Sequence, residues 1–110
     1  MKKLIHEEIE IGYSSEGRGQ AVVFIHGFCE DSDIWEEFKV DLLEKKYKVV
    51  CVDLPGFGES EVMQNLTIEA MADTVKAVVD HLNLVEIILV GHSMGGYTAF
   101  KFAEKYPDLL

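Results

Sequence analysis

Residues 87–96 read IILVGHSMGG, and the organisation of the chain follows from this stretch. Four apolar residues predict a buried strand, the Gly-x-Ser-x-Gly pattern predicts a sharp turn, and the residues after it predict a helix. A strand, turn and helix in this order form a nucleophile elbow, in which the serine backbone is strained and the turn leaves no room for side chains at Gly91 and Gly95. An ordinary strand-to-helix turn is the alternative interpretation. Ser93, at the tip, is the candidate nucleophile.

Two other apolar runs, residues 21–25 and 49–52, resemble the strand at 87–90. None of the three alternates between apolar and polar residues, which is typical of parallel strands covered on both faces. Helical segments separate them, so the order strand, helix, strand, helix, strand, helix predicts a doubly wound α/β layer with right-handed crossovers. Residues 4–11 predict an edge strand, and residues 12–19 predict the turn to a short antiparallel partner.

Three helices are expected. The first begins at Asp33, the second runs from Thr67, its N-cap, to about Leu82, and the third covers residues 94–106. The positions expected to be buried in the first helix are Trp35, Phe38 and Leu42. The third helix is apolar almost all round, so we expect it to be buried against the sheet and against something beyond it.

Composition restricts the possible functions. A chain of 110 residues with 48% hydrophobic residues predicts one small globular domain. A net charge of −10 with scattered Lys and Arg excludes a nucleic-acid surface and disfavours anionic membranes. Glu7 and Glu8 interrupt the N-terminus before a signal-peptide core can form. Cys29 and Cys51 form neither a disulfide framework nor a metal-ligand pattern, and Cys51 is expected to be a core thiol. Together these features predict a cytosolic protein.

Serine chemistry needs a base for the hydroxyl proton and preset hydrogen-bond donors for the oxyanion. The backbone amide of Met94 is one candidate donor, because it follows Ser93 at a helix N-terminus. The amide of Phe28 is the other, in the turn that follows the strand at 21–25. Gly27 gives that turn the freedom to aim an amide inward.

Three motifs together resemble the α/β-hydrolase superfamily: HGF at 26–28, DLPGFGES at 53–60 and GHSMGG at 91–96. Their order and approximate spacing are those of the N-terminal half of a small bacterial-type esterase, lactonase or carbon–carbon bond hydrolase. The resemblance implies a mostly parallel α/β-hydrolase-type sheet with an N-terminal antiparallel hairpin, incomplete here, with about five strands and three helices. It also implies that Ser93 is the nucleophile, that the Phe28 and Met94 amides form the oxyanion hole and that His26 shapes the oxyanion loop. No metal or organic cofactor is implied.

The chain departs from that family in one respect. There the catalytic acid and histidine follow the serine in sequence. Here no histidine follows Ser93, and the only later acids, Glu104 and Asp108, lie on or just past a helix that leads away from the turn. His26 is the best placed of the four histidines for a base, although its expected role is structural. We therefore expect residues 1–110 to be the N-terminal part of an α/β-hydrolase domain, without a second domain and without the acid and histidine of the triad.

Two classes of function remain open. The leading hypothesis is a serine hydrolase that cleaves an ester, thioester or lactone through an acyl-enzyme on Ser93, with this chain inactive by itself. The alternative is a non-catalytic α/β-hydrolase-like module that binds a partner chain. Carbon–carbon bond hydrolysis or cofactor-free peroxidation would use the same elbow, whereas epoxide hydrolase and haloalkane dehalogenase types need an aspartate at position 93. Expected partners are a small ester-like substrate and, along the open sheet edge at 86–90, a missing C-terminal half or a second copy.

Overall fold

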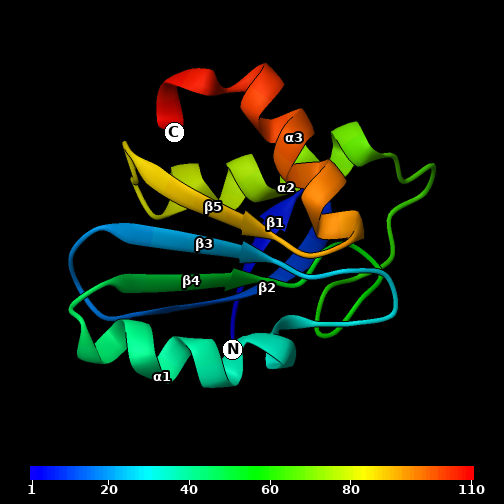
Figure 1. Cartoon of the computed structure of the whole chain (residues 1–110). Coiled ribbons are helices and arrows are strands. Elements are labelled where there is room, and N and C mark those ends of the chain that lie inside the picture. The colour runs from blue at the N-terminus through cyan, green and yellow to red at the C-terminus, as the bar shows by residue number, and fades with distance from the viewer.

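A five-stranded sheet forms the centre of the structure, a computed structural model that describes all 110 residues (Figure 1). The strands follow the order β1-β2-β4-β3-β5 across the sheet. Their bounds are Lys2–His6 (β1), Ile9–Glu16 (β2), Ala21–Ile25 (β3), Lys48–Val52 (β4) and Ile87–Gly91 (β5). β2 is antiparallel to both β1 and β4, whereas β3 is parallel to β4 and β5. Only β2 therefore runs against the other strands, and the expected mostly parallel sheet with an N-terminal hairpin is confirmed.

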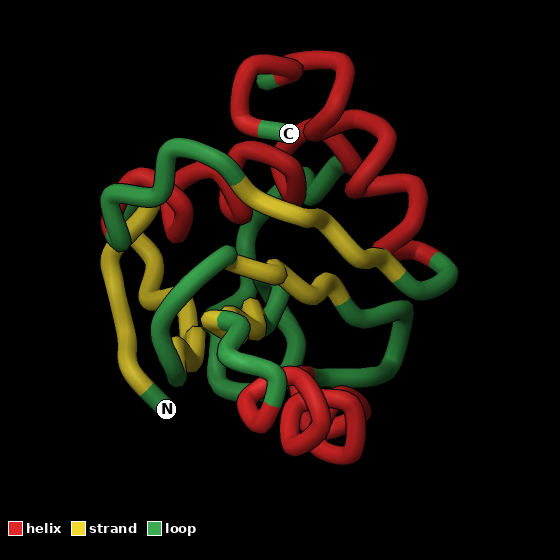
Figure 2. Tube along the Cα trace, turned by 60° about the vertical axis from the view of Figure 1, so that its left-hand side comes forward, coloured by secondary structure: helices red, strands yellow, loops and turns green.

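The helices cover both faces of this sheet. α2 (Ile68–His81) and α3 (Met94–Lys105) lie on one face, and α1 (Glu36–Glu44) lies on the other (Figure 1). Figure 2 shows the same separation from a second direction. Two short 3-10 helices, η1 (Ser32–Trp35) and η2 (Pro107–Leu109), precede α1 and follow α3. None of these helices combines the length and the apolar character that crossing a bilayer would require.

β3, an interior strand between β4 and β5, explains why the apolar runs do not alternate. Val23 and Ile25 point into the larger core, which α2 and α3 close. Val22 and Phe24 point into the smaller core on the opposite face, where Phe24 packs against Trp35 with ring centroids 4.7 Å apart. Both faces of the strand need apolar side chains, and all five residues of β3 are buried.

α2 begins as its sequence predicts. The Thr67 side chain accepts a hydrogen bond of 3.0 Å from the Ala70 amide, which satisfies one of the free donors of the first turn. The buried face follows the helical period. Its members are Met71, Ala72, Thr74, Val75, Val78 and Val79.

The N-terminal hairpin turns earlier than the sequence suggests. The turn lies at Glu7 and Glu8, whose φ angles of 51° and 67° are positive without any glycine. The prediction of a turn over residues 12–19 is wrong for most of that range, because β2 continues to Glu16. Gly12 lies inside β2 and is held by a neighbouring loop: its amide donates to the Ser60 hydroxyl at 2.8 Å, and its carbonyl accepts from the Asp53 amide at 2.9 Å.

The start of α1 also differs from the prediction. The cap is Asp31, whose side chain accepts from the Asp33 amide at 2.9 Å, and the 3-10 turn η1 precedes α1. A 3-10 turn has three residues per turn and so changes which side of the following helix faces the sheet. Trp35 is accordingly buried, but Phe38 is 59% exposed, and its expected burial is wrong.

The α3–β5 side of the molecule is less covered than predicted. Phe102 is fully buried against α2 and the sheet, but Tyr97 and Phe100 are 70% and 78% exposed. β5 pairs only with β3 and forms an edge of the sheet, with Ile88 44% exposed. The expectations that α3 is buried all round and that β5 is covered on both faces are therefore wrong for the described residues, because no element lies beyond β5.

Candidate active site

The turn between β5 and α3 has the geometry of an elbow. Ser93 has φ 56° and ψ −115°, a left-handed conformation that non-glycine residues rarely adopt. A Cβ atom at Gly91 would lie 2.5 Å from the Gly95 carbonyl carbon. A Cβ atom at Gly95 would lie 2.6 Å from the His26 carbonyl oxygen and 2.7 Å from the Ile25 carbonyl carbon. Both positions therefore require glycine, and Ser93 lies exposed at the tip.

The loop after β3 lies directly against this turn. β3 and β5 pair in parallel so that Ile25 lies opposite Gly91, and the His92 amide continues the pairing with a 3.0 Å hydrogen bond to the Ile25 carbonyl. A Cβ atom at Gly27 would lie 3.2 Å from the Ser93 Cβ atom. The structure thus brings Gly27 and Ser93, 66 residues apart in sequence, into immediate contact.

Both predicted donor amides are free. Neither the Phe28 amide nor the Met94 amide donates a hydrogen bond to another group of the chain. Met94 is the first residue of α3, where an unpaired amide is expected. The Phe28 side chain is 68% exposed and meets the Phe57 ring edge-on at 5.7 Å. Two unpaired amides from different elements are therefore available on the two segments that meet at Ser93.

His26 is buried and fully hydrogen-bonded. Its Nε2 atom accepts from the Leu54 amide at 2.9 Å, so this nitrogen carries no proton. The Nδ1 atom therefore carries the proton and donates it to the Gly27 carbonyl at 2.7 Å. With both nitrogens occupied, the ring connects the loop after β3 to the loop after β4 and has no lone pair free for the Ser93 proton.

Asp53 organises the loop DLPGFGES. It is 2% exposed, and its two carboxylate oxygens accept from the Ser32 and Glu59 amides, each at 2.9 Å. Ser60 closes the loop by donating its hydroxyl to the Asp53 carbonyl. The Asp53 carboxylate is thus fully engaged in positioning the loops around the elbow.

Glu30 was missed by the sequence analysis. Its Oε1 atom accepts from the Gly27 amide at 2.8 Å and lies 3.1 Å from His92 Nδ1. The hydrogen bond from His92 and then that from Gly27 lower the pKa of the Glu30 carboxyl. No motif marks this residue, because the contact depends on how the two loops meet.

The described residues bring no catalytic base to Ser93. His92 points to Glu30, His6 ends β1 at the far side of the sheet, and His81 lies at the end of α2 with its ring 5.8 Å from that of Tyr13. Glu104 pairs with Lys101 on α3 at 2.9 Å. The candidate nucleophile and the two unpaired amides are therefore present without an acid and base beside them.

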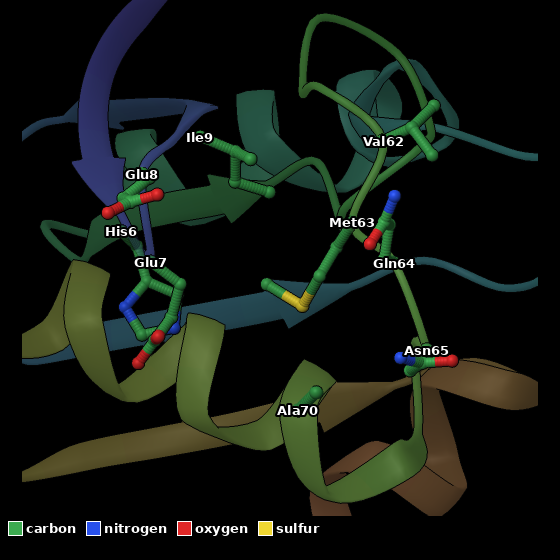
Figure 3. A pocket seen from close by; sticks show the side chains of 9 residues that line it. All are labelled: His6, Glu7, Glu8, Ile9, Val62, Met63, Gln64, Asn65 and Ala70. Carbon is green, nitrogen blue, oxygen red and sulfur yellow. The ribbon is translucent and has the colours of Figure 1, made fainter.

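A hollow of about 540 Å³ lies away from this site. Figure 3 shows it between the β1–β2 turn and the loop before α2. Its apolar part is formed by Ile9, Val62, Met63 and Ala70, and His6, Glu7, Glu8, Gln64 and Asn65 complete its wall. None of the residues around Ser93 contributes to it.

A mixed sheet of this order with a glycine-flanked serine between β5 and α3 defines the class of α/β-hydrolase fold proteins. The sequence profile of the alpha/beta hydrolase fold family matches residues 20–110, and the chain belongs to this family. This confirms the membership that the three motifs predicted.

Three relatives illustrate the similarity. A thermophilic esterase from Thermogutta terrifontis is 43% identical with a TM-score of 0.88. This match covers 93% of the present chain and 38% of the esterase chain. The N-acyl homoserine lactone degrading enzyme Est816 is 29% identical with a TM-score of 0.93, and the match covers 97% of the present chain and 41% of the Est816 chain. The 2-hydroxy-6-oxo-6-phenylhexa-2,4-dienoate hydrolase of Comamonas testosteroni is 36% identical over 107 residues, and the match covers 91% of the present chain and 37% of that hydrolase. The chain thus spans little more than a third of the length of such relatives.

Proposed function

We propose that this chain supplies the nucleophile and the oxyanion hole of a serine hydrolase that cleaves an ester, thioester or lactone. The observation that carries the proposal is the left-handed Ser93 backbone, held by Gly91 and Gly95 and placed against Gly27. The esterase and lactone-degrading relatives support this substrate class. In this proposal residues 1–110 are the N-terminal part of one α/β-hydrolase domain of a cytosolic enzyme.

In the proposed reaction, Ser93 Oγ attacks the substrate carbonyl carbon while a base takes the hydroxyl proton. The carbonyl oxygen becomes an oxyanion, which accepts hydrogen bonds from the Phe28 and Met94 amides. Collapse of the tetrahedral intermediate breaks the C–O or C–S bond, the base returns the proton to the leaving oxygen or sulfur, and the acyl group stays on Ser93. Water then attacks the acyl-enzyme and releases the acid, with the hydroxyl proton restored to Ser93. Because both amides are fixed by neighbouring structure before substrate arrives, they need no reorganisation during the reaction.

The base and the acid must come from outside the described residues. The uncovered side of β5 is the place where we propose that further chain docks, either a C-terminal half or a second copy. Ile88 on β5 is exposed, as are Tyr97 and Phe100 on α3, the helix that follows β5. An uncovered apolar edge of this kind favours strand addition. The same surface is what a non-catalytic module would use to bind a partner chain, which is the second candidate function.

A chimera tests the enzymatic proposal. Residues 1–110 replace the matched part of the Thermogutta terrifontis esterase, and hydrolysis of p-nitrophenyl acetate is measured. The Ser93→Ala chimera is the matched control, because it keeps every backbone contact of the elbow. Turnover that requires Ser93 is the expected result. A folded chimera whose rate equals that of the Ser93→Ala control would contradict the proposal and favour the partner-binding module.

A further inference from the structure

The Glu30 carboxylate contacts the two segments that meet at the candidate site. Gly27, which donates its amide to Oε1 at 2.8 Å, belongs to the loop after β3. His92, whose Nδ1 lies 3.1 Å from the same oxygen, immediately precedes Ser93. One oxygen atom therefore joins the loop that carries the Phe28 amide to the turn that carries the nucleophile.

The carbonyl group of Gly27 is held as well. The Gly27 carbonyl accepts from the Glu30 amide at 3.2 Å and from His26 Nδ1 at 2.7 Å. A trans peptide is planar, so its N–H points away from its C=O. Fixing the Gly27 carbonyl therefore also fixes the direction of the Phe28 N–H. A side chain at Gly27 would displace the Glu30 carboxylate, since a Cβ atom there would lie 2.7 Å from Oε1.

The electrostatics favour an ionised Glu30. The pKa of this carboxyl is lowered, first by the hydrogen bond from His92 and then by that from the Gly27 amide. The titratable groups that act on it are His92, from the elbow, and His26, from the end of β3. A hydrogen bond to an ionised carboxylate is shorter and stronger than one between neutral groups. Both hydrogen bonds to Glu30 are therefore charge-assisted, and the Glu30 side chain is about 30% exposed.

We propose that Glu30 is a positioning residue: by joining Gly27 to His92, it holds the Phe28 amide at a fixed position relative to Ser93. That this position matters for catalysis rests on the proposed function. The bridge itself is a property of the folded chain. Asp53 and His26 tie the neighbouring loops to one another, whereas Glu30 is the side chain that ties the oxyanion loop to the elbow directly.

The test is a pH titration of the 110-residue chain, with Ile88→Lys on the β5 edge as the common background that keeps every sample monomeric, followed through the Gly27 amide in ¹⁵N–¹H NMR spectra. In the wild type, this amide shift is expected to follow Glu30, with a midpoint below the ordinary value for a glutamate. Glu30→Gln, which keeps the shape and an acceptor oxygen, is expected to abolish that titration. His92→Ala is expected to raise its midpoint, because the His92 hydrogen bond is the main cause of the lowered pKa.

Hydrogen exchange gives a second readout on the same samples. Glu30→Ala is expected to speed exchange of the Gly27 amide about tenfold to a hundredfold, the range for loss of a hydrogen bond to a charged group. Glu30→Gln restores most of the protection. The control is the Phe57 amide, which donates to the Leu54 carbonyl in the neighbouring loop and keeps its rate.

Identical Gly27 titration and exchange in the wild type and in Glu30→Ala would overturn the proposal. Neither measurement needs turnover. An inactive chimera would therefore contradict the proposed function, but it would not test whether Glu30 joins Gly27 to His92. In an active chimera, Glu30→Ala is expected to lower kcat about tenfold, with rescue by Glu30→Gln, because a small misplacement of an oxyanion donor slows the chemical step.

Discussion

The backbone of Gly91 lies against the carbonyl group of Gly95, so that a Cβ atom at Gly91 would lie 2.5 Å from the Gly95 carbonyl carbon. The last residue of β5 and the first turn of α3 are thus packed backbone to backbone. Ser93 lies between them and has no freedom to leave its left-handed conformation without moving the helix. The tightness of this turn leads to the first prediction.

Gly95→Ala is expected to lower the free energy of unfolding by about 1–3 kcal/mol, because the new methyl group meets the His26 and Ile25 carbonyl groups. Gly96→Ala is the matched control: its nearest neighbour would be the Gly91 carbonyl oxygen at 3.8 Å. There alanine is expected to be neutral or to stabilise by up to about 1 kcal/mol, through helix propensity. Urea denaturation checks both. Equal stability of the two variants would contradict the elbow geometry.

Residues 1–110 alone are expected to hydrolyse p-nitrophenyl acetate at close to the background rate, equal to that of Ser93→Ala. Loss of the triad in a serine hydrolase lowers turnover by roughly a millionfold, leaving only binding and oxyanion stabilisation. The assay compares the two purified chains. Ser93-dependent turnover, with stoichiometric labelling by a fluorophosphonate, would show that these residues contain a base, and His26 would then have to break its two hydrogen bonds.

The isolated chain is expected to self-associate through the β5 edge. Ile88 lies there without charged neighbours in the strand, and Ile88→Lys is expected to restore a monomer, because a charge on an edge strand blocks pairing. The control is Ile5→Lys on β1, the opposite edge, which already carries Lys2 and Lys3. Light scattering measures the mass of each variant. A monodisperse wild-type monomer would count against this prediction.

Asp73 on α2 is expected to contribute to stability at neutral pH. Partial burial alone would raise its pKa, but hydrogen bonds from Lys105, at 2.7 Å, and from Tyr106 outweigh burial and hold the pKa below its ordinary value. A lowered pKa means that this contribution is present above the ordinary carboxyl pKa, about 3.9, and is lost as the pH falls through the lowered value.

Asp73→Asn should therefore cost up to about 1 kcal/mol near neutral pH, the upper range for part-exposed pairs. The difference from wild type should shrink as the pH falls through the lowered pKa of Asp73, so the second measurement is made well below the ordinary carboxyl pKa. Urea denaturation at the two pH values measures this. Glu104→Gln, which removes an exposed pair with Lys101, is the control and should change little. A constant difference at both pH values would argue against the ion pair.

The two cysteines are expected to differ in reactivity. Cys51 is 1% exposed in β4, and burial raises the pKa of its thiol to about 11, so little thiolate forms. Cys29 lies exposed in the loop after β3. The native chain should react with one equivalent of Ellman's reagent, and the unfolded chain with two. Cys29→Ser should abolish the fast reaction, and a native Cys29→Ser chain that reacts quickly would contradict the burial of Cys51.

The sequence predicted best where local pattern and tertiary contacts agree. The apolar run at 21–25 is the strand β3, because a strand with both faces covered needs apolar residues throughout. Thr67 caps α2 through its own side chain, a contact that lies within four residues of sequence. The elbow could be predicted because its glycines are required by backbone contacts that recur wherever such a turn is built.

Predictions failed where a distant segment decides the local structure. Gly12 suggested a turn, yet it lies in β2 because Ser60 and Asp53 bind its amide and carbonyl. The apolar pattern of α3 predicted burial, but Phe100 is exposed because nothing among the described residues covers it. Glu30 carried no signal at all, since its importance arises from the contact with His92, which lies 62 residues later.

The strand order also determines when the elbow can form. β3 is an interior strand, yet both of its neighbours come later in the chain: Ala21 pairs with Lys48 and with Ile87. Closing such long loops costs conformational entropy before any contact is gained, which makes non-local pairing slow. Gly95 rests against the Ile25 carbonyl, so Ser93 is forced into its left-handed conformation only once β5 has joined β3. During folding, the candidate nucleophile is therefore assembled together with the longest-range pairing of the sheet, and a chain that has only formed its hairpin and α2 has no reactive turn.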